Sequence, residues 1–87
     1  MVDKLARDRK KVDNLDLKLL KILAQRQVVI KDIGKLKKER QLAPLDKKRF
    51  QELLISRVKW GRTLNLDREL IENILKVIHH WSLRLQK

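Results

Sequence analysis

Apolar residues recur at three- and four-residue spacing along three stretches of the chain, and this spacing predicts α-helices. The first stretch runs from about Val2 to Arg40 with no proline and a single glycine, and its apolar positions are Leu5, Val12, Leu15, Leu19, Ile22, Leu23, Val29, Ile30, Ile33 and Leu36. A helix of this length is about 55 Å long, whereas a compact domain of about 100 residues has a radius of gyration near 13 Å. We therefore expect the first helix to need a packing partner along most of its length.

Two shorter helices are predicted after Pro44, which disfavours helix at the residue before it. Asp46 suits the N-cap of a helix from about Lys47 to Leu64, and Asp67 that of a helix from roughly Arg68 to Leu85. The third helix is expected to bury Leu70, Ile71, Ile74, Leu75, Ile78 and Leu85. No repeat or flexible linker divides the chain. The pattern predicts an all-α fold of three helices in a single domain, residues 1–87.

The charge of the chain is strongly positive, with 23 Lys+Arg against 11 Asp+Glu and a formal net charge of +12. Such an excess predicts attraction to an anion, which leaves nucleic acid, an anionic membrane and an acidic metabolite open. The aromatic residues are Phe50, Trp60 and Trp81, too few for a base-stacking platform. No apolar run approaches the roughly 20 residues that span a bilayer, and no secretory signal is visible at the N-terminus. A cytoplasmic location is expected.

Cysteine is absent from the chain, which excludes disulfides, thiolate metal sites and cysteine nucleophiles. A chain of 87 residues also buries only a modest share of its surface when it folds alone. Self-association is therefore the expected source of additional buried area.

Two cations lie beside the apolar stripe of the first helix. Arg26 and Lys37 are eleven residues apart, so they point within about 20° of each other and are separated by about 16 Å along the axis. Either they extend to solvent, as long cationic side chains usually do, or they bracket an anionic ligand. Arg9 lies about 25 Å before Arg26 and can reach the same site only from a second, antiparallel copy. The positions together predict a symmetric homodimer with shared sites.

The end of the third helix carries two neutral polar residues on one face, Ser82 and Gln86. They suit hydrogen bonding to a polar ligand, or they are surface residues near a helix end that is expected to fray. His79 and His80 point about 100° apart and cannot bind one metal ion, so each is expected to be a core or surface histidine and no metal site is predicted. The candidate site for a small dianion comprises Arg9, Arg26, Lys37, Asp46, Arg49, Ser82 and Gln86.

A series of short motifs carries a resemblance to a known family. The motifs are Arg9 with Val12-Asp13-Asn14-Leu15-Asp16, Leu23-Ala24-Gln25-Arg26, Ile33-Gly34-Lys35-Leu36-Lys37, Asp46-Lys47-Lys48-Arg49, Asn65-Leu66-Asp67, and Ser82 with Gln86. In this order they resemble the all-helical class of chorismate mutase along essentially the whole chain. The stretch from Pro44 to Phe50 is similar to a subgroup with an aromatic residue after the arginine, sometimes fused to the first synthase of the shikimate pathway.

The resemblance implies an intertwined homodimer that rearranges chorismate to prephenate in phenylalanine and tyrosine biosynthesis. In this family the reaction is a concerted pericyclic shift without cofactor, metal or covalent intermediate. By resemblance, Arg26 and Arg9 of the partner subunit would clamp the two carboxylates of the substrate. Lys37 and Gln86 would donate hydrogen bonds to the ether oxygen, where negative charge develops.

The remaining residues are expected to bind the rest of the substrate. By resemblance, Asp46 would lie near the ring hydroxyl, Arg49 would orient the carboxylates or Asp46, and Ser82 would bind a carboxylate. Phe50 would contact the ring where many relatives carry a glutamate. That difference leaves isochorismate-pyruvate lyase and 4-amino-4-deoxychorismate mutase open as alternatives, although Ser82 with Gln86 favours the chorismate mutase. A basic helical module that binds nucleic acid is the non-enzymatic alternative.

Overall fold

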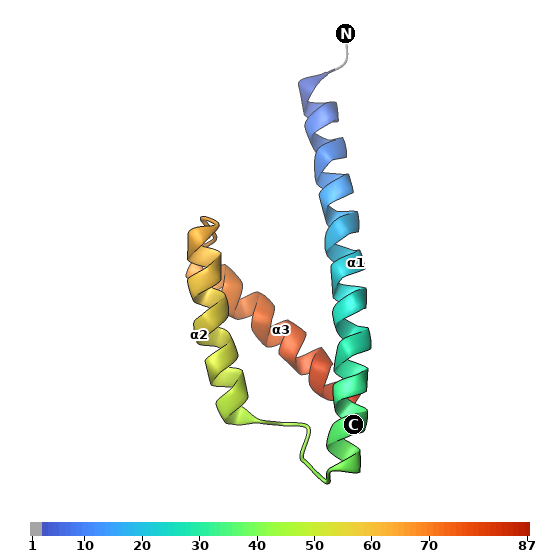
Figure 1. Ribbon diagram of the computed structural model, residues 1–87. Coiled ribbons are helices and arrows are strands. Elements are labelled where there is room, and N and C mark those ends of the chain that lie inside the picture. Colours follow the sequence, from blue (N-terminus) through green and yellow to red (C-terminus); the bar gives the residue numbers. More distant parts are fainter. Residues whose placement is uncertain (1–2) are drawn as a thin grey trace.

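The computed structural model describes residues 3–87 and contains three helices in the order α1 (Lys4–Glu39), α2 (Lys47–Thr63) and α3 (Arg68–Gln86) (Figure 1). No strand is present in this part of the chain, so the predicted all-α class is confirmed. The expected helix start at Val2 lies outside the described residues. The predicted C-terminal residue of each helix differs by one position from the observed one, which is the ordinary uncertainty of a helix terminus.

Aspartate side chains cap all three helices at their N-termini. Oδ1 of Asp46 accepts a hydrogen bond from the backbone N–H of Arg49 at 2.9 Å, and Oδ1 of Asp67 accepts one from Glu69 at 2.8 Å. Asp3 caps α1 in the same way. Each cap satisfies a backbone donor that has no partner inside the helix. The predicted caps at Asp46 and Asp67 are thereby confirmed.

Two residues beyond each of α1 and α2, the backbone is left-handed, with Gln41 at φ 57° and Asn65 at φ 60°. At the end of α1, the N–H of Leu42 donates to the carbonyl of Lys37 at 2.7 Å, and the N–H of Gln41 donates to that of Lys38 at 3.2 Å. This pair of bonds is the Schellman arrangement, which satisfies terminal helix carbonyls and usually places glycine in the left-handed position. Here an ordinary side chain occupies that position at the end of α1.

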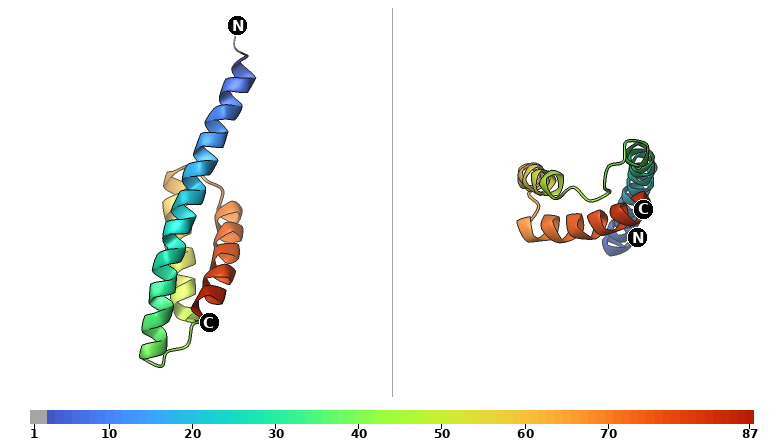
Figure 2. Two further views of the ribbon diagram at one scale, coloured as in Figure 1. Left: turned by 90° about the vertical axis from the view of Figure 1, so that its right-hand side faces the viewer. Right: turned by 90° about the horizontal axis from the view of Figure 1, so that it is seen from below.

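Helix α3 packs against both α1 and α2, whereas α1 and α2 do not pack against each other within the described residues. Seen from below, α2 stands near one end of α3 and α1 near the other, and the side facing away from α3 is open (Figure 2). The close contact of α2 with α3 depends on Gly61, because a Cβ atom at this position would overlap the side chain of Ile71. The large apolar residues buried in the described chain are Leu53 and Ile71.

The N-terminal half of α1 projects beyond the other two helices (Figure 2). The described chain extends over 61 × 24 × 16 Å, and its radius of gyration is 16.7 Å, compared with about 12 Å for a compact chain of this length. Large apolar side chains along this half of α1 are exposed, for example Leu15 at 60% and Leu20 at 61%. No helix in the described part of the chain is long and apolar enough to cross a membrane.

The predicted burial of Leu70 and Ile74 on α3 is wrong for the single chain, because each of these residues is 46% exposed. Periodicity identifies the apolar side of a helix but does not show which element covers it. In one chain, α3 touches its neighbours with only part of its apolar surface, and the rest faces outward.

Replacing Gln41 with glycine is expected to stabilise the fold, because glycine adopts positive φ without a Cβ clash. Left-handed backbone costs an ordinary residue about 1 kcal/mol. The greater conformational freedom of glycine in the unfolded chain offsets part of the energy that is gained by removing this strain. We therefore expect the free energy of unfolding to rise by about 0.5 kcal/mol. Thermal denaturation followed by circular dichroism at matched protein concentration measures it. The control Asn65→Gly should change less, because asparagine tolerates this conformation; a lower Tm for Gln41→Gly would contradict the assignment.

Candidate functional site

A cavity of about 450 Å³ lies between α1 and α2 with residues of α3 on its wall. Its volume is typical of sites for small organic molecules, which span roughly 300–1,000 Å³. The residues that line it come from all three helices and from the connection between α1 and α2. Within residues 3–87, α1 and α2 do not pack on each other and are joined through α3 and this connection, so the position of α3 sets the width of the cavity.

The structure brings most of the predicted site residues together in this cavity. The lining includes Arg26, Lys37, Asp46, Arg49, Phe50, Ser82 and Gln86. Arg9 does not line it, because it lies on the projecting half of α1, where every described residue is exposed. This placement agrees with the expectation that Arg9 does not reach the site of its own chain.

Lys37 is anchored by two hydrogen bonds rather than extended into solvent. Its Nζ atom donates to the backbone carbonyl of Pro44 at 2.7 Å and to Oε1 of Gln86 at 2.8 Å. These bonds leave one N–H of the ammonium group without a protein partner. Lys37 therefore presents a fixed positive charge and one free donor at the wall of the cavity.

The contact between α3 and α1 at Gln86 depends on Gly34. A Cβ atom at Gly34 would lie 3.0 Å from Cα of Gln86, so a larger residue would require the end of α3 to shift by a few tenths of an ångström. Gln86 is 7% exposed, and its Nε2 atom makes a long hydrogen bond of 3.4 Å to the carbonyl of Ser82. The alternative that Ser82 and Gln86 are surface residues is wrong, because Ser82 is 6% and Gln86 7% exposed, and Lys37 donates to Gln86. The sequence signal for this close approach was Gly34, the single glycine of the first helix, three residues before Lys37.

Arg26 is oriented by Ser82 on the facing helix. The Nη1 atom of Arg26 donates to Oγ of Ser82 at 2.8 Å, and the Ser82 hydroxyl donates to the carbonyl of Ile78 at 2.8 Å. The hydroxyl proton is thus already used, and Ser82 acts as an acceptor that positions the guanidinium. Partial burial lowers the pKa of Arg26, and the positive charge of Arg57 lowers it further. The guanidinium remains charged in any case.

Arg57 is a cavity residue that sequence reasoning missed. It lies one turn beyond Leu53, which is one turn beyond Arg49, and this spacing on α2 was the signal that could have identified it. Its Nη1 atom donates to Oγ of Ser56 at 2.9 Å, and its guanidinium carbon lies 4.6 Å from the centre of the Trp60 ring. Both contacts hold the side chain in place without neutralising its charge.

His79 is a second cavity residue that sequence reasoning missed. It was predicted to be a core or surface histidine, whereas it lines the cavity. Its ring stacks on Phe50 with centroids 3.8 Å apart and planes inclined by 18°, and both rings line the cavity. Burial lowers the pKa of His79, and the positive charges of Arg26 and Lys37 lower it further. The imidazole is therefore held in its neutral form by its surroundings.

The electrostatic character of the cavity is positive. Its charged lining comprises the cations Arg26, Lys37, Arg49 and Arg57 and the acid Asp46. Within residues 3–87 the salt bridges join Lys11 to Asp8 and Arg68 to Glu72, so none of these four cations is paired with a carboxylate. No group of three metal-binding side chains is found in the same range. Arg26, Lys37 and Arg57 are partly buried and Arg49 is exposed. Cations without a carboxylate partner at the wall of a cavity favour an anionic ligand.

The fold and the cavity together define a small all-α protein with a binding site for an organic anion. The family model described as chorismate mutase type II matches residues 8–87, and the chain belongs to that family. A curated protein named chorismate mutase from Methanocaldococcus jannaschii is 30% identical over 88 residues, which cover 100% of this chain and 88% of that relative.

The lowered pKa of His79 predicts a pH dependence of stability. The unfolded chain takes up the histidine proton near pH 6.5, whereas the folded protein resists it. Stability that is complete above about pH 6.5 is therefore lost progressively as the pH falls toward the lower folded pKa. His79→Phe keeps a ring against Phe50 but removes the titration. Chemical denaturation between about pH 8 and pH 5.5 should show a smaller loss for His79→Phe than for the wild type.

The matched control is His80→Phe, because His80 is the exposed neighbour of His79. It should retain the pH dependence of the wild-type protein. Equal losses of stability in the wild type and in His79→Phe would show that His79 is not the group responsible.

Proposed function

We propose that this chain is a chorismate mutase that rearranges chorismate to prephenate. The observation that carries the proposal is the ammonium group of Lys37, held by Pro44 and Gln86 at the wall of a positively charged cavity. Membership of the chorismate mutase type II family supports it, as does the identity to the archaeal relative. The enzyme belongs to the biosynthesis of phenylalanine and tyrosine.

The reaction is concerted: the ether C–O bond breaks while a new C–C bond forms within the same molecule. The protein therefore needs no nucleophile, and it assists in two ways. It holds the substrate in the compact conformer in which the reacting carbons are close, and it stabilises the charge that develops as the C–O bond breaks. The cavity offers groups suited to both tasks.

Lys37 and Gln86 are the proposed donors to the ether oxygen. Lys37 retains one N–H after its bonds to Pro44 and Gln86. Gln86 accepts from Lys37 through Oε1 and makes only one long bond through Nε2, so an amide N–H is also free. Two fixed donors beside the oxygen that gains charge stabilise the transition state more than the substrate.

Cationic groups on two helices are the proposed partners of the substrate carboxylates. Arg26 is oriented by Ser82, and Arg49 stands at the start of α2. A guanidinium binds a carboxylate through two parallel hydrogen bonds, which fixes orientation as well as charge. Asp46 uses Oδ1 as the cap of α2, and its second oxygen is the proposed acceptor for the ring hydroxyl.

A second copy of the chain is proposed to complete the site. The projecting half of α1 exposes apolar side chains such as Leu19 at 55% and Ile22 at 60%, and its length favours pairing with an antiparallel copy. In that homodimer, Arg9 of the partner subunit would enter the cavity and bind the second carboxylate. The intertwined dimer and its shared sites remain predictions.

Phe50 bears on the choice between related substrates. Many relatives carry a glutamate at this position, whose carboxylate would face the substrate ring. Here Phe50 stacks on His79, so two aromatic rings stand in that place. Nothing in the cavity favours isochorismate-pyruvate lyase or 4-amino-4-deoxychorismate mutase over chorismate mutase, and the named relative supports the last. Nucleic-acid binding has no specific support. The subgroup sometimes fused to the shikimate-pathway synthase and the cytoplasmic location remain predictions.

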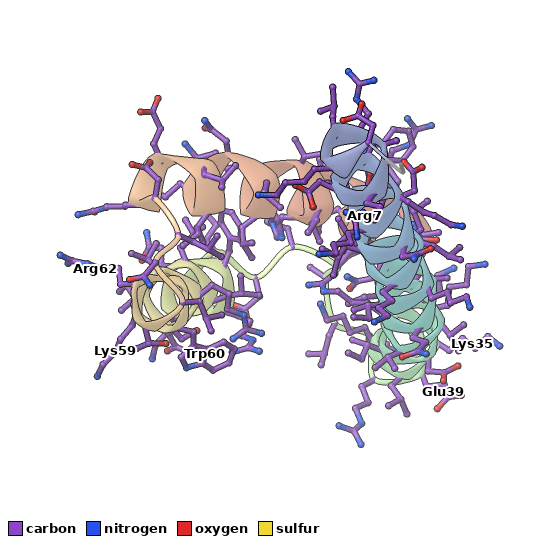
Figure 3. The ribbon with its side chains drawn as sticks, turned by 90° about the horizontal axis from the view of Figure 1, so that it is seen from above. Arg7, Lys35, Glu39, Lys59, Trp60 and Arg62 are labelled. Carbon is purple, nitrogen blue, oxygen red and sulfur yellow. The ribbon has the colours of Figure 1, made fainter. Side chains whose placement is uncertain are left out.

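Lys37→Ala is expected to reduce kcat by about two to three orders of magnitude, because it removes a fixed donor to the developing charge. The disappearance of chorismate, followed by ultraviolet absorbance, measures the effect. Lys35→Ala is the matched control, since Lys35 lies on the same helix but points away from α2 (Figure 3). Both variants should keep wild-type helicity and molecular mass. Near-native turnover by Lys37→Ala would remove Lys37 from the mechanism.

Mixing inactive Arg9→Ala and Lys37→Ala chains is expected to restore activity if sites are shared. A heterodimer then has one intact site and one doubly defective site. At equal amounts and full exchange, about half of the dimers are mixed, so about a quarter of the wild-type activity should return. Turnover before and after subunit exchange measures this recovery. No recovery under verified exchange would mean that each site comes from one chain.

A further inference from the structure

Two arginines from different helices face the same cavity without a carboxylate between them. Arg26 lies on α1 and Arg57 lies on α2, and both line the cavity and are only partly exposed. They are close enough for the charge of Arg57 to disfavour the protonated form of Arg26 and lower its pKa. Neither arginine is in a salt bridge within residues 3–87. Like charges brought together in a partly buried site destabilise the protein unless an anion joins them.

The contacts of Arg57 orient its guanidinium but leave most of its donors unused. One Nη1 bond reaches Ser56, whose own hydroxyl donates to the carbonyl of Leu53. The aromatic face of Trp60 lies 4.6 Å from the guanidinium carbon. A planar guanidinium held in this way keeps further N–H groups for a carboxylate, and it loses little conformational freedom when it binds one.

We propose that Arg57 is a substrate-binding residue that shares one carboxylate of the dianionic substrate with Arg26. The inference rests on the proposed function and adds to it a cation from α2. Because α1 and α2 do not pack against each other, a carboxylate held by both arginines becomes a direct link between these helices. Substrate binding then stabilises the relative position of all three helices as well as orienting the reacting groups.

Steady-state kinetics with chorismate test the assignment. Arg57→Gln should raise KM by about ten- to a hundredfold, because it removes a charge-assisted hydrogen-bonding group from the bound carboxylate. Arg57→Lys should recover only part of the affinity, since a point charge cannot form the planar fork. The matched control is Arg62→Gln on the same helix, because Arg62 lies on the side of α2 away from α1 (Figure 3). It should leave KM unchanged.

Thermal denaturation separates binding from a structural role. Without ligand, Arg57→Gln should melt no lower than Arg62→Gln, because the lost contact with Trp60 is offset by the relieved repulsion with Arg26. Added prephenate should raise the Tm of the wild type and of Arg62→Gln by more than that of Arg57→Gln. A lower Tm of unliganded Arg57→Gln together with an unchanged KM would overturn the proposal and leave Arg57 as a packing residue.

Two further outcomes are distinguishable. Arg57→Gln could instead shift the protein from dimer to monomer at low protein concentration and leave KM unchanged. In that case Arg57 would bind a carboxylate of the second copy rather than the substrate, and the proposal would be wrong. If the wild-type protein did not turn over chorismate, the proposed function would fail. The prephenate-induced Tm shifts of the wild type and Arg57→Gln would still decide whether Arg57 binds the dicarboxylate.

Discussion

The hydrogen bond between Lys37 and Gln86 joins two positions 49 residues apart and holds the end of α3 against α1. Gly34 favours this bond, because a Cβ atom there would lie 3.0 Å from Cα of Gln86 and would force the two backbones apart by a few tenths of an ångström. Helix α2 packs against α3 as well, with Gly61 next to Ile71 near the start of α3, and these two contacts set the width of the cavity between α1 and α2. The position of Gln86, the anchoring of Lys37 and the shape of the cavity at this end depend on the close approach of α3 to α1.

The cavity concentrates positive charge that the protein does not neutralise internally. Burial and neighbouring cations lower the pKa of both Arg26 and His79, which is the physical sign of an environment that disfavours further positive charge. An arrangement of this kind costs stability in the free protein and becomes favourable when a dianion enters. In the proposed mechanism, the groups that weaken the free fold are the groups that bind the substrate and stabilise the transition state.

The single chain leaves a large apolar surface without a partner. Within residues 3–87, nothing covers the apolar side chains on the projecting half of α1 or Leu70 and Ile74 on α3. A second copy would cover such surface and would bring Arg9 to a neighbouring cavity. In the proposed homodimer, folding, association and completion of the site would be coupled, because each would depend on the same long helix.

The sequence by itself determined the features that arise from local physics. Helical periodicity, the break at Pro44 and the caps at Asp46 and Asp67 depend on nearby residues, so the three helices and their ends could be predicted closely. The shared face of Arg26 and Lys37 likewise follows from the helical repeat. The roles of the candidate residues were implied by resemblance rather than by these patterns.

Only the tertiary structure decided which helix faces meet. It revealed Arg57 and His79 as cavity residues, the buried end of α3 at Gln86, and the use of Ser82 to orient Arg26. It also showed Leu70 to be exposed where periodicity predicted burial. The physical reason is that burial and proximity depend on packing between distant segments, which a local pattern of residues does not specify.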